Sequence, residues 1–214
     1  MRRTTHALFM AVMLVLTLGV AAPAQAGKAP PVPIKGTLVG AETVYPAGSW
    51  DYDGYFGNQK QEFVVDGVTY TCSEPANELV LGTMTGNLSH LGKVTREMSY
   101  CLRWDDEFPV VHVVDFTLVL TAANGDTVNL DFQSSADSVE GDGWVGYGGE
   151  LAFAGGTGRF VDASGMLTET GRMIPSWYPP GFPFGSTGSD PWVRELSATY
   201  TGEISYDASN RAAK

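Results

Sequence analysis

Apolar and polar residues alternate with a period of two along several stretches of this chain. Val128, Leu130 and Phe132 alternate with polar residues at the positions between them. The same alternation runs through residues 195–206 and through residues 94–104, where Arg96 is the exception on the apolar face. Successive side chains of a β-strand point to opposite faces, so this period predicts strands with one face toward a core and the other toward water.

The stretch 110–171 organises the predicted sheet. It contains predicted strands at residues 110–121 and 127–133, separated by Asn124 and Gly125. Asn-Gly favours a type I′ turn, because that turn needs positive φ at both central residues. The glycine-rich corner 155–160 then leads into another strand. A tight turn explains its glycines better than a phosphate loop, because no Gly-Lys-Ser/Thr motif is present.

The remaining strand signals complete an all-β pattern. Further strands are predicted at residues 34–39, 63–65, 68–72 and 79–88. Beyond the first 26 residues no long stretch has the helical period. About eight to ten strand-like runs, with turn signals every 8 to 12 residues, are typical of all-β folds. We expect a closed antiparallel β-barrel of about eight strands, with a β-sandwich as the alternative.

The first 26 residues have the pattern of a secretory signal peptide. Arg2 and Arg3 precede an apolar run at residues 7–20 and a small-residue site that ends at Ala26. The apolar run is shorter than the roughly 20 residues that a membrane-spanning helix needs. The sequence therefore predicts cleavage near Ala26, a secreted or periplasmic protein, and no stable membrane insertion.

The rest of the chain is expected to form one domain. A proline-rich leader at residues 27–33 precedes a barrel domain at 34–206, and a polar tail follows at 207–214. Loss of Arg2 and Arg3 would leave 11 of the 13 basic residues against 24 acidic ones, a formal charge of −13. Such an acidic surface repels phosphate backbones, which argues against a nucleic-acid partner.

Cys72 and Cys101 are the two cysteines of the chain. In an oxidising compartment such a pair predicts a disulfide, with two separate buried thiols as the alternative. Closing a loop of about 30 residues would stabilise the fold by roughly 3 to 4 kcal/mol in the chain-entropy account.

A long segment rich in proline and aromatic residues lies at 172–194. Loops of this length are uncommon unless they are functional or disordered. One interpretation is a lip over the barrel mouth that presents rings to an apolar ligand or a partner; the other is a plug packed on the barrel's own surface. The candidate ligand-binding residues are Trp177, Tyr178, Phe182, Phe184 and Trp192.

Two histidines and one aspartate are the candidates for metal binding or proton transfer. His90 and His112 lie in separate segments without metal-ligand spacing, so structural or surface roles are favoured, and neither a metal nor a cofactor is predicted. Asp115 interrupts an apolar strand, and an inward carboxylate there would have a raised pKa suited to proton transfer. Strict alternation instead places Asp115 outside and His112 inside.

Three short segments carry a resemblance to a known family. Residues 121–126, 155–160 and 163–165 resemble the sheet signature of the small, calycin-like β-barrels of the allene oxide cyclase and dirigent type. Residues 89–93 are similar to a segment of exported bacterial proteins of uncharacterised function. The resemblance implies an eight-stranded barrel with an apolar lumen, which in the plant enzymes holds a small hydrophobic substrate. No catalytic carboxylate of those enzymes aligns with a position here, so no catalytic residue is assigned.

Three functional hypotheses follow. The first is a barrel that binds a small apolar molecule or a partner at its mouth without catalysis. The second is an enzyme of the cyclase or dirigent kind that steers a reactive intermediate in the lumen. The third is a structural envelope protein with a filled barrel. An open apolar lumen would favour the first, a cavity with one buried polar group the second, and a filled core the third.

Overall fold

The computed structural model describes residues 29–48, 58–104, 111–139, 145–174 and 191–206. The strands are β1 (Val32–Pro46), β2 (Lys60–Val65), β3 (Val68–Ala76), β4 (Glu78–Leu88), β5 (Gly92–Trp104), β6 (Val111–Ala122), β7 (Thr127–Val139), β8 (Val145–Gly156), β9 (Ser164–Ile174) and β10 (Trp192–Ser205). One short 3-10 helix, η1 (Gly158–Phe160), lies between β8 and β9. No helix in the described residues is long and apolar enough to cross a membrane.

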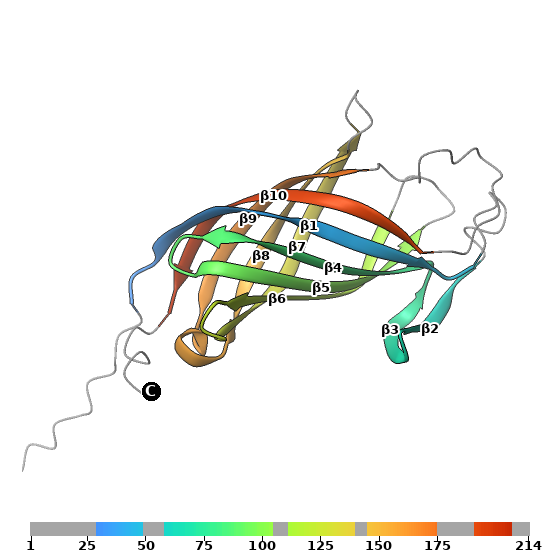
Figure 1. Ribbon diagram of the computed structural model, residues 1–214, viewed down its shortest axis with the longest axis horizontal. Coiled ribbons are helices and arrows are strands. Elements are labelled where there is room, and N and C mark those ends of the chain that lie inside the picture. Colours follow the sequence, from blue (N-terminus) through green and yellow to red (C-terminus); the bar gives the residue numbers. More distant parts are fainter. Residues whose placement is uncertain (1–28, 49–57, 105–110, 140–144, 175–190, 207–214) are drawn as a thin grey trace, which may run out of the picture.

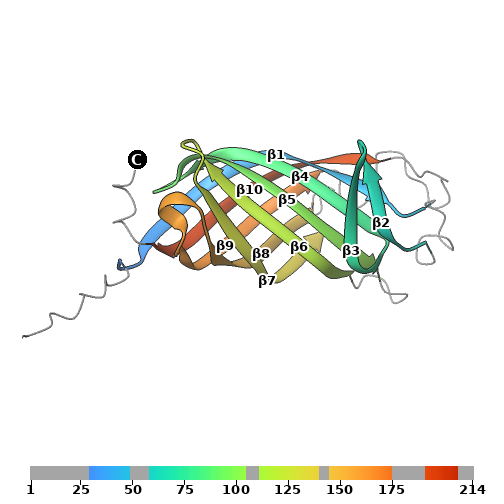
Figure 2. The same cartoon turned by 90° about the horizontal axis from the view of Figure 1, so that it is seen from below.

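Eight strands close into an antiparallel barrel in the order β1-β10-β9-β8-β7-β6-β5-β4, and β4 pairs with β1 to complete the circle. The remaining strands, β2 and β3, form a separate two-stranded sheet that lies beside the barrel wall, near one end of the barrel (Figures 1 and 2). The predicted all-β barrel is confirmed, and the sandwich alternative is wrong. Closure pairs the strands around the circle, so the barrel has no terminal edge strand.

The alternation read from the sequence matches the burial of the strands. In β7, Val128 and Leu130 are buried while Asn129 and Asp131 are exposed. In β10, residues 194, 196, 198, 200 and 204 face inward and are buried, while the odd-numbered residues 193–203 are exposed. The inward side chains of the barrel form its main hydrophobic core, which includes Leu38, Leu120, Leu167 and Tyr200.

The turns follow the glycines, with one difference from the prediction. Asp66 and Gly67 both have positive φ, as a type I′ turn between β2 and β3 requires. In the turn between β6 and β7 only Gly125 has positive φ, and its amide donates to the Ala122 carbonyl at 2.9 Å. The type I′ prediction for Asn124 is therefore wrong. A longer loop that ends in a left-handed glycine serves this hairpin instead.

Some strands are longer than the patterns indicated, and one was not predicted. β1 begins at Val32, inside the predicted leader, and runs to Pro46. The sequence does not predict β8 (Val145–Gly156), because glycines at 146, 148 and 149 weaken the alternating pattern. Pairing with β7 and β9 on both sides holds this glycine-rich strand in place.

One end of the barrel is closed by the glycine-rich corner. Gly155 and Gly158 have positive φ, as a tight turn requires, and Phe160 of η1 is fully buried. Thr157 and Thr127 exchange backbone and side-chain hydrogen bonds. The buried Asp126 carboxylate accepts a 3.4 Å bond from the Arg159 amide. These bonds fasten the corner to the β6–β7 turn, and apolar side chains fill this end.

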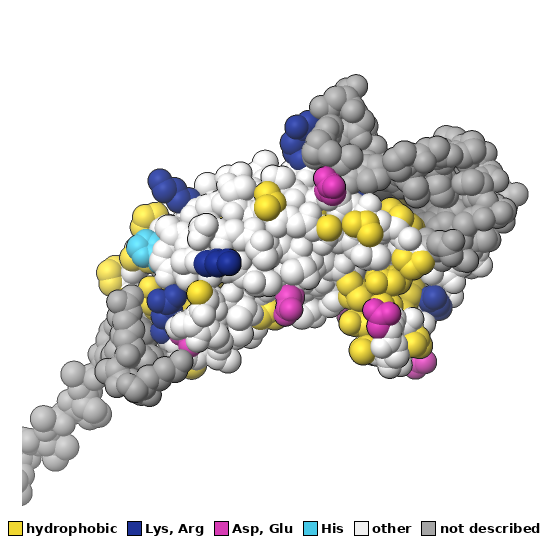
Figure 3. Space-filling model, viewed as in Figure 1, with side chains coloured by type: hydrophobic (Ala, Val, Ile, Leu, Met, Phe, Trp, Pro, Cys, Tyr) yellow, Lys and Arg dark blue, Asp and Glu magenta, His cyan; other side chains and the backbone are white. Residues whose placement is uncertain are grey.

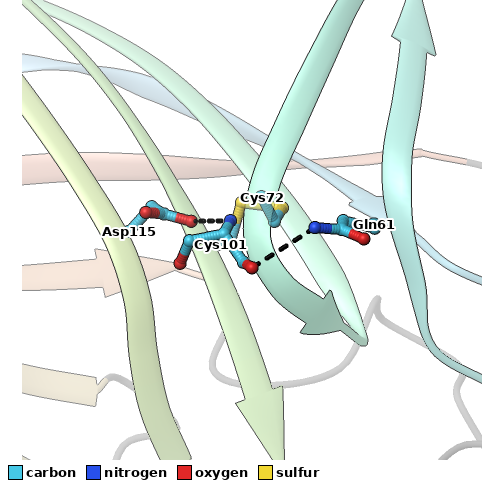
Figure 4. The surroundings of a disulfide bond; sticks show 5 residues. Gln61, Cys72, Cys101 and Asp115 are labelled. Carbon is cyan, nitrogen blue, oxygen red and sulfur yellow. Dashed lines mark hydrogen bonds between the residues drawn. A yellow bond between two sulfur atoms is a disulfide. The ribbon is translucent and has the colours of Figure 1, made fainter.

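The β2–β3 hairpin is held against the outer face of the barrel. Cys72 of β3 and Cys101 of β5 form the predicted disulfide, with Cα atoms 6.1 Å apart (Figure 4). A second, smaller core forms beneath the hairpin from Phe63, Val65, Cys72, Ala76, Leu79 and Cys101. On the hairpin's own surface Val64 and Val68 are 70% and 53% exposed, and hydrophobic side chains gather visibly over this region (Figure 3).

A bulge in β6 decides where two of the candidate polar residues lie. Cys101 pairs with Asp115 but Leu102 pairs with Val113, so Val114 is an extra residue in β6. Asp115 faces outward as predicted, and its Oδ2 accepts a 2.6 Å bond from the Ser73 amide of the hairpin (Figure 4). Beyond the bulge the alternation is inverted, so His112 is exposed, and the prediction that it faces inward is wrong.

The seam between β6 and β7 is the weakest in the barrel wall. Pairing runs only from Leu118↔Leu130 to Thr121↔Thr127, whereas the other neighbouring barrel strands pair over eight or more positions in the described residues. Beyond Leu130, β7 stays paired with β8 through two register shifts and diverges from β6. In Figure 1 the last part of β7 and the first part of β8 rise away from the beginning of β6.

Candidate functional site

Five buried charged side chains lie at inward-facing positions of the barrel strands, and we call them the charged layer. Its members all occupy inward positions of strands whose neighbouring inward residues are mostly apolar. They are Glu42 of β1, Glu78 of β4, Arg96 of β5, Glu169 of β9 and Arg194 of β10, each between 2% and 6% exposed. Buried charges cost several kcal/mol each unless they are paired and hydrogen-bonded, so their partners decide what this layer can do.

The first group is centred on Arg96. Its guanidinium forms an ion pair with Glu169 and donates to the hydroxyl of Tyr200. The Tyr200 hydroxyl donates in turn to Glu169 Oε1 at 2.8 Å, which closes a triangle. Arg96 Nη1 also lies 3.4 Å from the Met84 sulfur, on the residue directly opposite in β4. Three strands, β5, β9 and β10, are thereby connected through the lumen.

The second group is centred on Glu42. Arg194, its pairing partner on β10, places Nη2 2.5 Å from Glu42 Oε1. Tyr100 of β5 donates its hydroxyl to Glu42 Oε2 at 2.8 Å and accepts a 3.3 Å bond from Arg194. Gly82 of β4 lies opposite Glu42. Because Gly82 has no side chain, the Met98 side chain fills the space beside it. The ion pair is therefore packed on its sides by apolar groups.

Burial and charge keep the lumen tyrosines protonated. Desolvation raises the pKa of Tyr100, and the negative charge of Glu42 raises it further. Desolvation likewise raises the pKa of Tyr147, and Glu169 adds to the shift. For Tyr200 desolvation is again the main cause of the raised pKa, although Arg96 opposes it. These hydroxyls are hydrogen-bond donors at neutral pH rather than bases.

Arg96 is held in its charged form despite its burial. Desolvation alone would lower the pKa of its guanidinium, but the negative charge of Glu169 and the hydrogen bond to it raise the pKa overall. The guanidinium of Arg96 therefore stays charged at neutral pH and pairs with Glu169 across the lumen.

Beside this charged layer, inward-facing apolar and aromatic side chains on five consecutive strands remain only partly buried. They are Tyr100 of β5, Phe116 of β6, Phe132 of β7, Tyr147 of β8 and Met173 of β9. The Phe116 ring lies 6.1 Å from that of Tyr100 and 5.2 Å from that of Phe132, centroid to centroid. Inward positions of the same strands nearer the corner, such as Leu120 and Leu167, are fully buried. The lumen is thus packed at the corner end and less tightly covered on this side.

The aromatic residues predicted to bind a ligand are only partly placed by the structure. Trp177, Tyr178, Phe182 and Phe184 lie outside the described residues. Trp192 is described, but the prediction that it belongs to a loop is wrong, because β10 begins at this residue. Its ring packs inside the barrel against Val44, Val80 and Leu102, next to the charged layer.

Sequence reasoning missed most of the charged layer, although a signal was present. Arg96 is the exception on an apolar face of its strand, and Arg194 continues the apolar parity of Leu196 and Ala198. Glu169 shares the parity of the buried Leu167 in the same way. A charged residue on the inward parity of a barrel strand predicts a partner across the lumen, but which strand supplies that partner depends on the register.

One group of side chains in the described residues has the spacing of a metal site. Cys72, Cys101 and Asp115 offer ligand atoms within 4.8 Å of one another. The two sulfurs are joined in a disulfide, and thiolates rather than disulfide sulfurs bind metals tightly. In its oxidised form this group has a structural role, because it joins β3 to the barrel strands β5 and β6.

Comparisons with protein families, curated proteins and solved structures found no match to this chain. The resemblance to the allene oxide cyclase and dirigent barrels stays a prediction. What the structure defines is the class of fold, a closed eight-stranded antiparallel barrel with a charged layer in its lumen.

Proposed function

We propose that the protein binds a small, largely apolar molecule in the part of its barrel lumen lined by Tyr100, Phe116, Phe132, Tyr147 and Met173. The observation that carries this proposal is their incomplete burial on five consecutive strands, against complete burial at the corner end. Ligand sites in proteins are typically lined by apolar and aromatic side chains with a few fixed polar groups. The charged layer supplies those polar groups.

Binding fits the lumen better than catalysis. The acidic and basic side chains are engaged with one another, and the tyrosine hydroxyls have raised pKa values. A general acid or base works best when its pKa lies near the working pH. The network is suited to holding and orienting a molecule.

We also propose that the mature protein works outside the cytoplasm. Residues 1–26 have the pattern of a signal peptide, and the disulfide between Cys72 and Cys101 is of the kind that persists in oxidising compartments. We place the mature protein in a secreted or periplasmic location. Its acidic composition suits a soluble carrier of apolar cargo rather than a nucleic-acid partner.

Native mass spectrometry of the protein isolated from its own source tests the proposal. A small-molecule adduct that is removed by solvent extraction is expected in the wild type. Phe132→Ala removes one lining ring and should reduce the adduct, while Val193→Ala, on the exposed face of β10, should leave it unchanged. Repeated isolation without any adduct, together with no saturable uptake of apolar probes, would favour a structural role.

A further inference from the structure

In the described residues, the wall of the barrel is interrupted at the seam between β6 and β7. The two strands pair only over residues 118–121 and 127–130, and both then continue without pairing to each other. The corner end of the lumen is closed, because the buried Phe160 ring packs edge-on against Tyr206, with ring centroids 5.2 Å apart. The seam therefore offers a sideways route to the row of partly buried side chains, and the corner end does not.

Bulges on both sides of the seam accompany the separation of the strands. β6 contains the extra residue Val114, and the pairing of β7 with β8 shifts between Phe132 and Ser134. A bulge bends its strand and increases the local twist, and bulges are frequent at barrel rims and beside active sites. In Figure 1 β6 and β7 separate beyond their short paired region. The separation therefore involves local irregularities in both strands.

Two phenylalanine rings meet where the backbone pairing ends. Continuing the register places Phe116 opposite Phe132, one inward position beyond Leu118 and Leu130, and their ring centroids are 5.2 Å apart. At this level ring contact takes the place of the hydrogen bonds of a β-ladder. Side chains change rotamer faster than paired strands separate. The two rings can therefore move apart without the loss of a backbone hydrogen bond between β6 and β7.

The two rings connect the outside of the seam with the interior. The Phe116 ring lies 6.1 Å from the Tyr100 ring, and the Tyr100 hydroxyl donates into the charged layer. On the outer face, Thr117 and Asp131 are exposed. A molecule that passes between the rings thus moves from solvent directly into the proposed binding region.

From these observations we infer that apolar molecules enter and leave the lumen sideways through the β6–β7 seam, and that Phe116 and Phe132 form the gate. The inference rests on the proposed function and adds to it the route of exchange and the residues that control its rate. Closing a passage changes the barriers to entry and exit equally and leaves the free and bound states unchanged. Closing the gate should therefore slow exchange without changing the affinity.

A disulfide across the seam tests the route. Thr117→Cys combined with Asp131→Cys places two cysteines on the outer face, at the positions that directly follow the last paired residues. Stopped-flow fluorescence measures uptake and release of the neutral probe N-phenyl-naphthylamine by the mature protein. With the bridge formed, both rates should fall at least about tenfold and Kd should stay within about twofold of the wild type, as a conformational barrier to binding would give.

A second pair of cysteines is the matched control. Thr170 and Thr199 are exposed partners in the continuously paired seam between β9 and β10, so Thr170→Cys with Thr199→Cys should change neither rate. Mild reduction opens an exposed bridge and should restore the wild-type rates in the β6–β7 variant. The native bridge between Cys72 and Cys101 is buried and should resist the same treatment.

The outcomes separate this inference from the proposed function. Unchanged rates in the bridged β6–β7 variant would show that the probe uses another route, which overturns the inference and leaves lumen binding intact. If the wild type shows no saturable binding of the probe, the proposed function and the inference both fail.

Removal of one gate ring is the second test, and it decides the inference if the bridge does not form. Phe116→Ala should raise the association rate of the probe at least about tenfold, because the barrier to entry is removed. Met173→Ala removes a lining side chain on β9, away from the seam, and should change the affinity through the dissociation rate alone. An association rate that rises equally in both variants, or in neither, would overturn the assignment of the gate.

Discussion

Arg96 shows how a single residue can tie the barrel together. It occupies an inward position of β5 between Val94 and Met98, where a charge without partners would be costly. Glu169 and Tyr200 reach it from strands that are far away in the sequence. The local pattern marks Arg96 as an anomaly, and only closure of the barrel explains it.

Breaking this pair should be far more damaging than breaking an ion pair on the surface. Arg96→Met leaves Glu169 buried without its counter-charge and should lower the free energy of unfolding by about 3–5 kcal/mol. Arg103→Met removes the exposed pair with Glu74 and should cost less than about 1 kcal/mol. Urea denaturation measures both. Adding Glu169→Leu to Arg96→Met should recover much of the loss; if it does not, the pair is not the source of the penalty.

The lumen tyrosines predict a particular response to alkali. The pKa values of Tyr100, Tyr147 and Tyr200 are raised in the folded state, so folding favours their protonated forms. This contribution is fully present below the ordinary tyrosine pKa of about 10 and is lost as pH rises above it toward the raised values.

Tyrosinate absorbance in a pH titration checks that response. The three hydroxyls should ionise only at a higher pH than free tyrosine, together with unfolding. Tyr147→Phe should remove one tyrosine from that late step. Ionisation of all the tyrosines near pH 10 in protein that is still folded would contradict the prediction.

At the scale of strands, the two parts of β7 differ in how many neighbouring strands they pair with. The half nearest the turn is paired on both sides, to β6 and to β8, whereas beyond Leu130 only β8 pairs with it in the described residues. A strand with one bonded neighbour opens more readily than one with two.

Hydrogen exchange should reveal this difference directly. Amides of β7 bonded to β6, around residues 127–130, should exchange slowly, and those beyond Leu130 that face the β6 seam should exchange at least about tenfold faster, corresponding to about 1.4 kcal/mol less protection. Uniform protection along β7 would mean that the seam is closed in solution.

Strand patterns predicted β7 and β10 because their alternation is regular. β8 was missed because glycine carries no side chain to make an alternating pattern. The change at Val114 in which residues of β6 face inward could not be predicted from the sequence either. A bulge is fixed by the partner strand and, here, by the hairpin that binds Asp115. The position of His112 was predicted wrongly for this reason alone.

At the scale of the whole molecule, the fold class could be predicted and the candidate site could not. Repeated period-two runs and turn residues are local properties, and they sufficed for an antiparallel barrel. The charged layer needs inward-facing residues from β1, β4, β5, β9 and β10, and which of them meet depends on the stagger of all the strands. The expectation of an apolar lumen therefore needs correction, since charged and aromatic layers share it.

The disulfide contributes to the stability of the molecule as a whole. Replacing both Cys72 and Cys101 by Ala should lower the free energy of unfolding by about 3–4 kcal/mol, since the cross-link no longer restricts the unfolded chain. Asp115→Asn, which weakens only the bond from the Ser73 amide, should cost about 1 kcal/mol. Thermal or urea unfolding with intact and reduced protein measures both, and a disulfide loss no larger than that of Asp115→Asn would show that the hairpin is held by packing alone.

The disulfide-linked hairpin also decides in which compartment the protein can be expressed in soluble form. Leu79, Leu81 and Val114 on the outer face of the barrel are covered by the β2–β3 hairpin, which continues into β4 at Asn77 and is cross-linked to β5 by one disulfide. In a reducing cytoplasm the disulfide would not persist. A loosened β2–β3 hairpin would then expose apolar side chains and two unpaired strand edges, to which other chains could bind. Recombinant protein made in a reducing cytoplasm should therefore aggregate, while protein directed to an oxidising compartment should remain soluble.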